Sequence, residues 1–186
     1  MPVRPERTGV TMRSDDRTVV LTGATSGIGR VAAAELADRG ATVAAVGRDR
    51  ARGEALEAAA AGAAGVVRFH RTDLATREAV RTLAADLRRS YDRIDVLAHN
   101  AGLSAGSRRE TADGVELTLA VNHLAPYLLT HELLDHLRES PDPRVVVTAS
   151  EVHRRTTLDP DDLQFDQGYD ALAAYARSKA AVIAFT

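Results

Sequence analysis

Short runs of apolar residues alternate along the chain with longer segments in which apolar side chains recur at every third or fourth position. The short runs, rich in β-branched residues, predict strands at residues 19–21, 41–46, 66–71, 94–98 and 144–148. Apolar runs of this kind are typical of parallel strands that are buried on both faces. The helical periodicity between them predicts connecting helices, so the pattern indicates an α/β domain.

We expect these helices at residues 27–40, 51–61, 76–91, 114–137 and 171–186. Apolar side chains at helical spacing are the pattern of a helix that covers one face of a sheet. In the first helix, we expect an apolar stripe to pack back on the preceding strand. This stripe comprises Ile28, Val31, Ala32 and Leu36.

The helix expected at residues 114–137 contains a proline. Pro126 has no backbone N–H, so the carbonyl oxygen of Asn122, four residues earlier, lacks its usual helical donor. The proline therefore marks either an ordinary kink or a carbonyl that is available to another partner.

A glycine-rich turn joins the first strand to the first helix. Gly23, Gly27 and Gly29 lack Cβ atoms, so they can adopt positive φ and let the backbone approach a bound group closely. The start of the helix directs unpaired N–H groups to the same place, which suits an anion such as a pyrophosphate. Glycines also mark ordinary tight turns, but the order of strand, glycines, helix and strand favours a nucleotide site.

Several motifs in the chain are similar to those of one known family. Residues 22–29, Thr-Gly-Ala-Thr-Ser-Gly-Ile-Gly, resemble the TGxxxGxG signature of the short-chain dehydrogenase/reductase family. Residues 99–102, His-Asn-Ala-Gly, resemble its NNAG motif, with a histidine in place of the first asparagine. Tyr175 and Lys179 lie four residues apart on one helix face, as in its YxxxK motif, and Ser150 follows the fifth strand.

The resemblance is to classical members of the family and runs from Thr22 to Lys179. The segment from Ser150 to Tyr175 is similar in length to that of the retinol-dehydrogenase-like branch and of antibiotic-pathway ketoreductases. The resemblance implies a doubly wound Rossmann-type parallel sheet with helices on both faces, forming an NAD(P)-binding domain at residues 17–186. Family sheets continue past the YxxxK helix, so it also implies a domain that lacks its C-terminal strands.

The resemblance implies that the cofactor binds the loops that follow the strands. In the family, an aspartate at the place of Asp73 holds the adenine amino group, although a helix cap is an alternative role for this residue. The residues expected to bind the cofactor are Thr22, Gly23, Thr25, Ser26, Gly27, Ile28, Gly29, Arg48, Asp73, Leu74, Asn100, Ala101, Gly102, Tyr175 and Lys179.

Asn122, Ser150, Tyr175 and Lys179 form the catalytic group that the resemblance implies. Tyr175 would donate a proton in reduction or accept one in oxidation, while Lys179 would stabilise its phenolate and reach the nicotinamide ribose. Ser150 would position the substrate oxygen, and the backbone of Asn122 would hold a water connected to Lys179. Lys179 is the only lysine in a chain with 24 basic residues, which suggests a position that arginine does not serve.

Arg48 follows the second strand at the place where a dinucleotide-binding unit meets the adenosine ribose. An acidic residue there suits the free hydroxyl of NAD, whereas an arginine suits the 2′-phosphate of NADP. We therefore expect a preference for NADP(H). Asp49 leaves NAD(H) open, and Arg48 as a solvated loop residue is the structural alternative.

The composition narrows the range of partners. The 186 residues include 24 basic and 26 acidic ones, well mixed along the chain, so we expect neither a nucleic-acid nor a membrane partner. Cysteine is absent, and His131 and His136 are five residues apart, so they point to different sides of a helix and do not form the zinc motif, which needs histidines four apart on one face. We therefore expect no metal. Residues 1–16 lack the apolar core of a signal peptide, and we expect a disordered lead-in to a cytoplasmic protein.

Two functional interpretations follow. The first is an NADP-dependent oxidoreductase that transfers hydride between nicotinamide and a small carbonyl or alcohol substrate, as a ketone reductase or alcohol dehydrogenase. The second is a truncated, non-catalytic NADP-binding or regulatory protein. The resemblance also leaves open a homo-oligomer formed through the helices that contain Asn122 and Tyr175.

Overall fold

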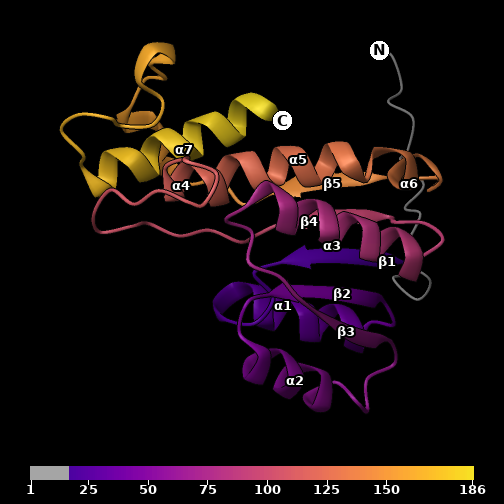
Figure 1. Ribbon diagram of the computed structural model, residues 1–186. Coiled ribbons are helices and arrows are strands. Elements are labelled where there is room, and N and C mark those ends of the chain that lie inside the picture. Colours follow the sequence, from indigo (N-terminus) through magenta and orange to yellow (C-terminus); the bar gives the residue numbers. More distant parts are fainter. Residues whose placement is uncertain (1–16) are drawn as a thin grey trace, which may run out of the picture.

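The computed structural model describes residues 17–186, and its centre is a parallel sheet with the strand order β3-β2-β1-β4-β5 (Figure 1). The five strands are β1 (Thr18–Thr22), β2 (Thr42–Gly47), β3 (Val66–Arg71), β4 (Val96–His99) and β5 (Arg144–Val147). All five predicted strands are confirmed, with small shifts at their ends. The expectation for residues 1–16 lies outside the described residues.

The fourth strand begins two residues later than the apolar pattern suggests. The backbone N–H of Ile94 donates to the carbonyl oxygen of His136, a helical residue, and not to a neighbouring strand. Asp95 is the first residue of this segment to bond to the sheet, because its backbone N–H donates to the carbonyl oxygen of Thr18 at the start of β1. Ile94 is fully buried nonetheless, which explains why its hydrophobicity resembles that of a strand residue.

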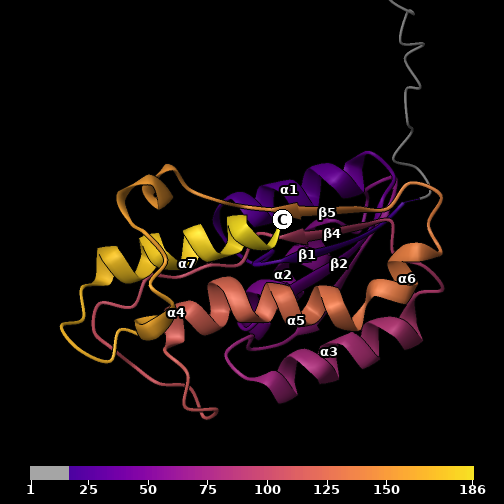
Figure 2. The ribbon, with the colours of Figure 1, turned by 90° about the horizontal axis from the view of Figure 1, so that it is seen from above.

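Two layers of helices cover the sheet (Figure 2). On one face lie α1 (Gly27–Asp38) and α2 (Arg50–Ala59). On the other lie α3 (Arg77–Ser90), α5 (Ala125–Glu132) and α6 (Leu134–Arg138). Side chains of β1 alternate between the two cores, with Val19 and Leu21 toward α1 and Val20 toward α3 and α5. The expected doubly wound parallel sheet with helices on both faces is therefore confirmed.

The prediction for the buried face of α1 was wrong for Ile28 and Val31, whereas Ala32 and Leu36 pack against the core as expected. Ile28 and Val31 are 77% and 60% exposed, whereas the buried positions are Gly29, Ala33 and Ala37. These small residues recur every four positions and let the helix lie close to the sheet. The large apolar side chains alone therefore did not identify the packed face. At Gly29 the approach is so close that an added Cβ would lie 2.2 Å from the carbonyl oxygen of Gly23.

The single helix expected at residues 114–137 is divided into several parts. It consists of α4 (Leu117–Leu119), the π-helical turn η1 (Ala120–Leu124), α5 and α6, with Leu133 between the last two. In η1 the backbone N–H of Ala125 donates to Ala120, five residues earlier, one residue before Pro126 removes a donor from the helix. The apolar pattern runs through these breaks because Leu133 itself is fully buried.

The chain after β5 has little regular structure until its last helix. Two 3₁₀ turns, η2 (Glu151–Arg155) and η3 (Pro160–Asp162), precede α7 (Ala171–Phe185). Asp170 begins α7, since its carboxylate accepts a hydrogen bond from the N–H of Ala173 at 2.7 Å. Among residues 17–186, no helix is both long and apolar enough to cross a bilayer.

Candidate functional site

The strand order reverses between β1 and β4, and the loops that follow these strands meet there. The Thr22 hydroxyl oxygen accepts hydrogen bonds from the N–H groups of Asn100 and Ala101, both at 3.1 Å. The Asn100 amide donates back to the carbonyl oxygen of Thr22, also at 3.1 Å. Thr22 and Asn100 therefore fix the two loops that border the crevice in which doubly wound folds bind their ligands.

The glycine turn needs its glycines for two reasons. Gly23 and Gly27 have φ values of +69° and +51°, which side chains rarely allow. A Cβ on Gly23 would also lie 2.8 Å from the Cα of Ala101. Ser26 at the N-cap makes no side-chain hydrogen bond to α1, and no acidic residue occupies the first helical turn. The positive end of α1 is thus left for an external anion.

A groove of about 150 Å³ runs along the ends of β1, β2 and β3. Eight residues expected to bind the cofactor line it: Gly23, Thr25, Ser26, Arg48, Asp73, Leu74, Ala101 and Gly102. Sequence reasoning missed five further lining residues: Val46, Gly47, Thr72, Leu103 and Val121. Of these five, Gly47 is the one that the sequence could have indicated, as a glycine at the end of a strand. Its lack of a side chain is required, because a Cβ there would lie 2.5 Å from the Thr25 side chain.

The remaining residues of the cofactor set lie outside the lining of this groove. Thr22 and Asn100 act behind it by joining the two loops, and Gly27 and Gly29 start α1. Ile28 projects into solvent at the same helix end. Tyr175 and Lys179 lie on α7, close to the end of the groove formed by Gly102 and Leu103.

Two acidic residues beside the groove have different roles. Asp49 caps α2, accepting a hydrogen bond from the N–H of Arg52 at 3.1 Å and pairing with its guanidinium at 3.3 Å. Asp73 instead accepts from the N–H of Ala75, and it is Thr76 that caps α3. The alternative role of Asp73 as a helix cap was therefore wrong. Its carboxylate stays at the groove.

Lys179 is almost completely buried on α7. Its Nζ donates to the carbonyl oxygen of Thr148 at 2.7 Å and lies 5.7 Å from the ring centre of Tyr175. Burial lowers the pKa of Lys179. The ammonium is thus held between the end of β5 and the face of the tyrosine, with two donors left for other partners.

Asn122 connects α7 to the loop that follows β4. Its side-chain oxygen accepts from the N–H of Leu103 at 2.9 Å, and its amide donates to the Leu103 carbonyl at 2.8 Å. A Cβ on Gly102 would lie 3.4 Å from this side-chain oxygen and 3.5 Å from Nζ of Lys179. Asn122, Lys179 and Gly102 therefore meet at one point.

Ser150 follows β5 and begins η2. Its hydroxyl oxygen accepts a hydrogen bond from the N–H of Val152 at 3.3 Å, and η2 packs along α7. The strand end and the helix thus bring Ser150 to the same side of the molecule as Tyr175 and Lys179.

His99 occupies the place of the first asparagine of the NNAG motif. Burial lowers the pKa of His99 to about 4, so the ring is neutral near pH 7. Its Nε2 is 2.8 Å from the hydroxyl of Thr130 on α5. The histidine therefore joins the sheet to a covering helix.

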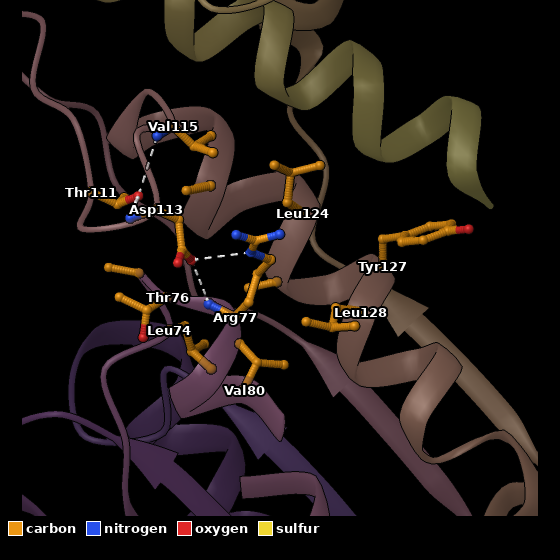
Figure 3. A pocket seen from close by; sticks show the side chains of 13 residues that line it. Leu74, Thr76, Arg77, Val80, Thr111, Asp113, Val115, Leu124, Tyr127 and Leu128 are labelled. Atoms are coloured by element: carbon orange, nitrogen blue, oxygen red, sulfur yellow. Dashed lines mark hydrogen bonds and ion pairs between the residues drawn. The ribbon is translucent and has the colours of Figure 1, made fainter. Parts of the chain in front are cut away.

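A second and larger cavity, of about 330 Å³, lies between the start of α3 and the η1–α5 region (Figure 3). Apolar side chains such as Val80 and Leu128 line it, and Asp113 pairs with Arg77 at its rim. Leu74 lines both cavities. None of the four expected catalytic residues lines this larger cavity, so we place the candidate site at the groove and at α7.

Comparison with known proteins gives consistent matches. The family model described as short chain dehydrogenase matches residues 17–186. A Streptomyces sp. (strain C5) protein assigned as the daunorubicin C-13 ketoreductase DnrU is 46% identical over 90% of this chain and 58% of its own length. Mouse retinol dehydrogenase 14 is 40% identical over 91% of this chain and 54% of its own. The chain thus spans little more than half the length of these two relatives.

A solved structure agrees with these matches. A metagenomic short-chain oxidoreductase crystallised in complex with NADP superposes with a TM-score of 0.74 at 26% identity. The match covers 92% of this chain and 74% of the other.

Proposed function

The chain belongs to the short-chain dehydrogenase family, and from this premise we propose that it transfers hydride between NADP(H) and a small carbonyl or alcohol substrate. In this role it acts as a ketone reductase or an alcohol dehydrogenase. The observation that carries the proposal is the meeting of Lys179, Asn122 and Gly102 at the end of a groove suited to a dinucleotide.

The groove has the features that a dinucleotide requires. Gly23 lines the groove and lets the turn pack directly on the backbone of Ala101, so the loops after β1 and β4 lie close together beside the phosphate position. The start of α1 has no side-chain cap, so its N–H groups can bind the pyrophosphate. Arg48 and Asp73 lie farther along the groove, where the adenosine part would bind.

Each catalytic side chain has a task in this proposal. When bound, the nicotinamide cofactor supplies or accepts the hydride. Tyr175 donates a proton to the substrate oxygen in reduction and accepts one in oxidation, and the ammonium of Lys179 stabilises its anionic form. Ser150 holds the substrate oxygen by a hydrogen bond.

Asn122 has a double role in the same proposal. Its side chain is fully used by Leu103 and α7, so it fixes the geometry of the site. Its backbone carbonyl has no donor at Pro126 and is available to a water that connects to Lys179.

Preference for NADP(H) rests on the two residues that follow β2. Arg48 lines the groove, and its guanidinium matches the charge and geometry of a phosphate. Asp49, the residue that could bind the ribose hydroxyl of NAD, caps α2 and pairs with Arg52. With its carboxylate bound to Arg52 in this way, Asp49 is poorly placed to accept a hydrogen bond from the ribose hydroxyls of NAD.

The second candidate is an NADP-binding protein without turnover. It is favoured by the outer strand of the sheet among the described residues, β5, where Val145 and Val146 are 41% and 50% exposed. In this candidate the groove binds the cofactor, but the site for a carbonyl substrate is incomplete.

Self-association of the chain is a further part of the proposal. The exposed faces of Tyr127 on α5 and Ile183 on α7 offer apolar surface on the two helical regions that flank the site. We place the contact of a homo-oligomer there.

One experiment tests the two candidate functions, and size-exclusion chromatography of the same protein tests the proposed self-association. NADPH and NADH are titrated against the protein by fluorescence, and the oxidation of NADPH is then followed with a panel of ketones. Tight NADPH binding with turnover supports the reductase, and tight binding without turnover supports the second candidate. Absence of binding by either cofactor contradicts both.

A further inference from the structure

Two segments with little regular structure lie against each other beyond the carboxyl end of the sheet (Figure 2). One is the loop at residues 103–116, which leaves β4 just after Gly102. The other is the segment at residues 156–170, which lies between Ser150 and Tyr175. Both segments therefore begin or end at residues of the candidate site.

Arg108 makes the principal connection between them. Its Nε donates to the carbonyl oxygens of Phe165 at 2.9 Å and Gln164 at 3.3 Å. Its two Nη atoms pair with Asp166 and Glu110, each at 2.6 Å. The side chain is only 25% exposed, so these contacts are partly shielded from water. A planar guanidinium can serve all four acceptors at once, which an ammonium cannot do with the same geometry.

The backbone that Arg108 holds is unusual. Phe165 has a φ of +51°, a left-handed conformation that residues other than glycine rarely adopt. Its ring stacks under the guanidinium of Arg177, which lies 3.6 Å from the ring centre. Phe165 is thus held on one side through its carbonyl and on the other through its ring. Such a conformation persists only where surrounding contacts fix it.

Further bonds join the same two segments. The N–H of Glu116 donates to the side-chain oxygen of Gln164 at 3.2 Å, and the hydroxyl of Tyr169 donates to the carbonyl oxygen of Ala105 at 3.0 Å. The near end of the loop is attached to the site itself, because Leu103 is bonded through its backbone to Asn122.

We propose that Arg108 is a positioning residue that fixes the wall against which the carbonyl substrate is placed. This inference rests on the proposed function, because one of the segments that Arg108 joins follows Gly102 and the other lies between Ser150 and Tyr175, which are residues of the candidate site. Without the guanidinium, the segment between Ser150 and Tyr175 loses its three contacts with Arg108, at Gln164, Phe165 and Asp166, and samples other conformations. The cofactor groove, which neither Arg108 nor residues 156–170 line, keeps its shape.

The test compares Arg108→Ala with Arg109→Ala in the active form of the protein, including any C-terminal continuation that its gene encodes. Arg109 is the adjacent exposed arginine, and its known contact uses only its backbone carbonyl, which accepts from Leu117 at 2.8 Å. Three quantities are measured: the KM for a ketone that the parent reduces, the Kd for NADPH, and the rate of chymotrypsin cleavage after Phe165.

We expect Arg108→Ala to raise KM about tenfold, since small displacements of positioning groups have effects of this order. Cleavage after Phe165 should accelerate by a similar factor, while the Kd for NADPH changes less than about twofold. Arg109→Ala should leave all three unchanged. An unaltered KM, or an unaltered cleavage rate, in Arg108→Ala overturns the proposal.

Two further variants separate positioning from general loss of folding. Asp166→Asn removes one ion pair and keeps the carbonyl contacts, so it should give a smaller KM increase at an unchanged melting temperature. Arg108→Lys should recover the charge but not the double contact to Gln164 and Phe165, and its KM should lie between those of the parent and Arg108→Ala. A full recovery by lysine contradicts the geometric role. Cleavage and NADPH binding are measured without turnover, so they stay informative if the proposed reaction itself fails.

Discussion

The side-chain amide of Asn122 donates a hydrogen bond to the hydroxyl oxygen of Ser178 at 2.9 Å, and Ser178 donates in turn to the carbonyl oxygen of Tyr175 at 2.7 Å. Ser178 is completely buried. The π-helical turn η1 is thereby tied to the turn of α7 that carries the proposed acid. The position of Tyr175 depends on a residue of another helix.

Ser178→Ala tests this link. The change leaves one donor of Asn122 buried without a partner, which costs about 1–3 kcal/mol in the free energy of unfolding. We expect kcat/KM for a ketone to fall about tenfold as Tyr175 shifts. Urea unfolding and steady-state kinetics provide the two measurements, with Ser107→Ala, an exposed serine, as the control. Parental kinetics in a destabilised Ser178→Ala protein would show that the link is only structural.

Lys179→Arg preserves the charge but not the shape. Nζ of Lys179 sits in a confined place near Thr148 and Gly102, where a wide planar fork does not fit. We expect kcat/KM to fall at least tenfold, which is about 1.4 kcal/mol of transition-state stabilisation, together with weaker NADPH binding. Steady-state kinetics and a cofactor titration measure both effects.

Tyr175→Phe should lower kcat/KM further than Lys179→Arg does, because it removes the proton donor and leaves only the ring. Tyr127→Phe, on the exposed surface of α5, is the matched control. Steady-state kinetics on the same ketone decide the matter. Near-parental rates for Tyr175→Phe would mean that Tyr175 and Lys179 have a structural role and not a catalytic one.

Arg48→Ala should separate the two cofactors. One charge-assisted phosphate contact is worth about 1.5–3 kcal/mol, so the Kd for NADPH should rise roughly ten- to a hundredfold. The Kd for NADH should change little. Arg50→Ala is the control, since Arg50 pairs with Glu54 at 3.3 Å on α2. If NADH binds the parent more tightly than NADPH does, the proposed preference is wrong.

His99 should make the stability of the fold depend on pH. Its pKa is about 4 in the folded protein and near 6.5 in the unfolded chain, so the unfolded state binds more protons between these values. Stability is therefore complete above about pH 6.5 and falls as the pH drops toward 4, by about 3 kcal/mol in all. Urea unfolding at several pH values measures this loss.

His99→Asn restores the motif typical of the family and should remove this part of the pH dependence. The exposed His131 is the control position, and His131→Asn should keep the parental profile. An identical pH profile in His99→Asn and the parent would show that other groups govern the acid sensitivity.

The sequence was a good guide where local composition decides the structure. The runs at Val19 and Val43 are apolar throughout because these strands are buried on both faces. The glycine turn is visible in the sequence because its backbone needs positive φ at Gly23 and Gly27 and a close approach to Ala101. The pattern misled in α1, where Gly29 and Ala33 pack and Ile28 does not.

Contacts between distant residues were beyond the reach of such patterns. Nothing in the local sequence of Asn122 shows that its side chain bonds to Leu103 and Ser178, which lie 19 and 56 positions away. The connection from Arg108 to Asp166 spans 58 positions and depends on how two loops meet. Such pairs arise only once the sheet has brought the loops together.

The burial of Lys179 gives the protein a built-in chemical reporter. Its lowered pKa increases the share of neutral, nucleophilic amine near pH 7, while its position limits access by reagents. Because the chain has no other lysine, reductive methylation can mark only this side chain and the terminal amine. The labelling rate of one atom would then record, without any assay of turnover, how often the centre of the molecule opens to solvent.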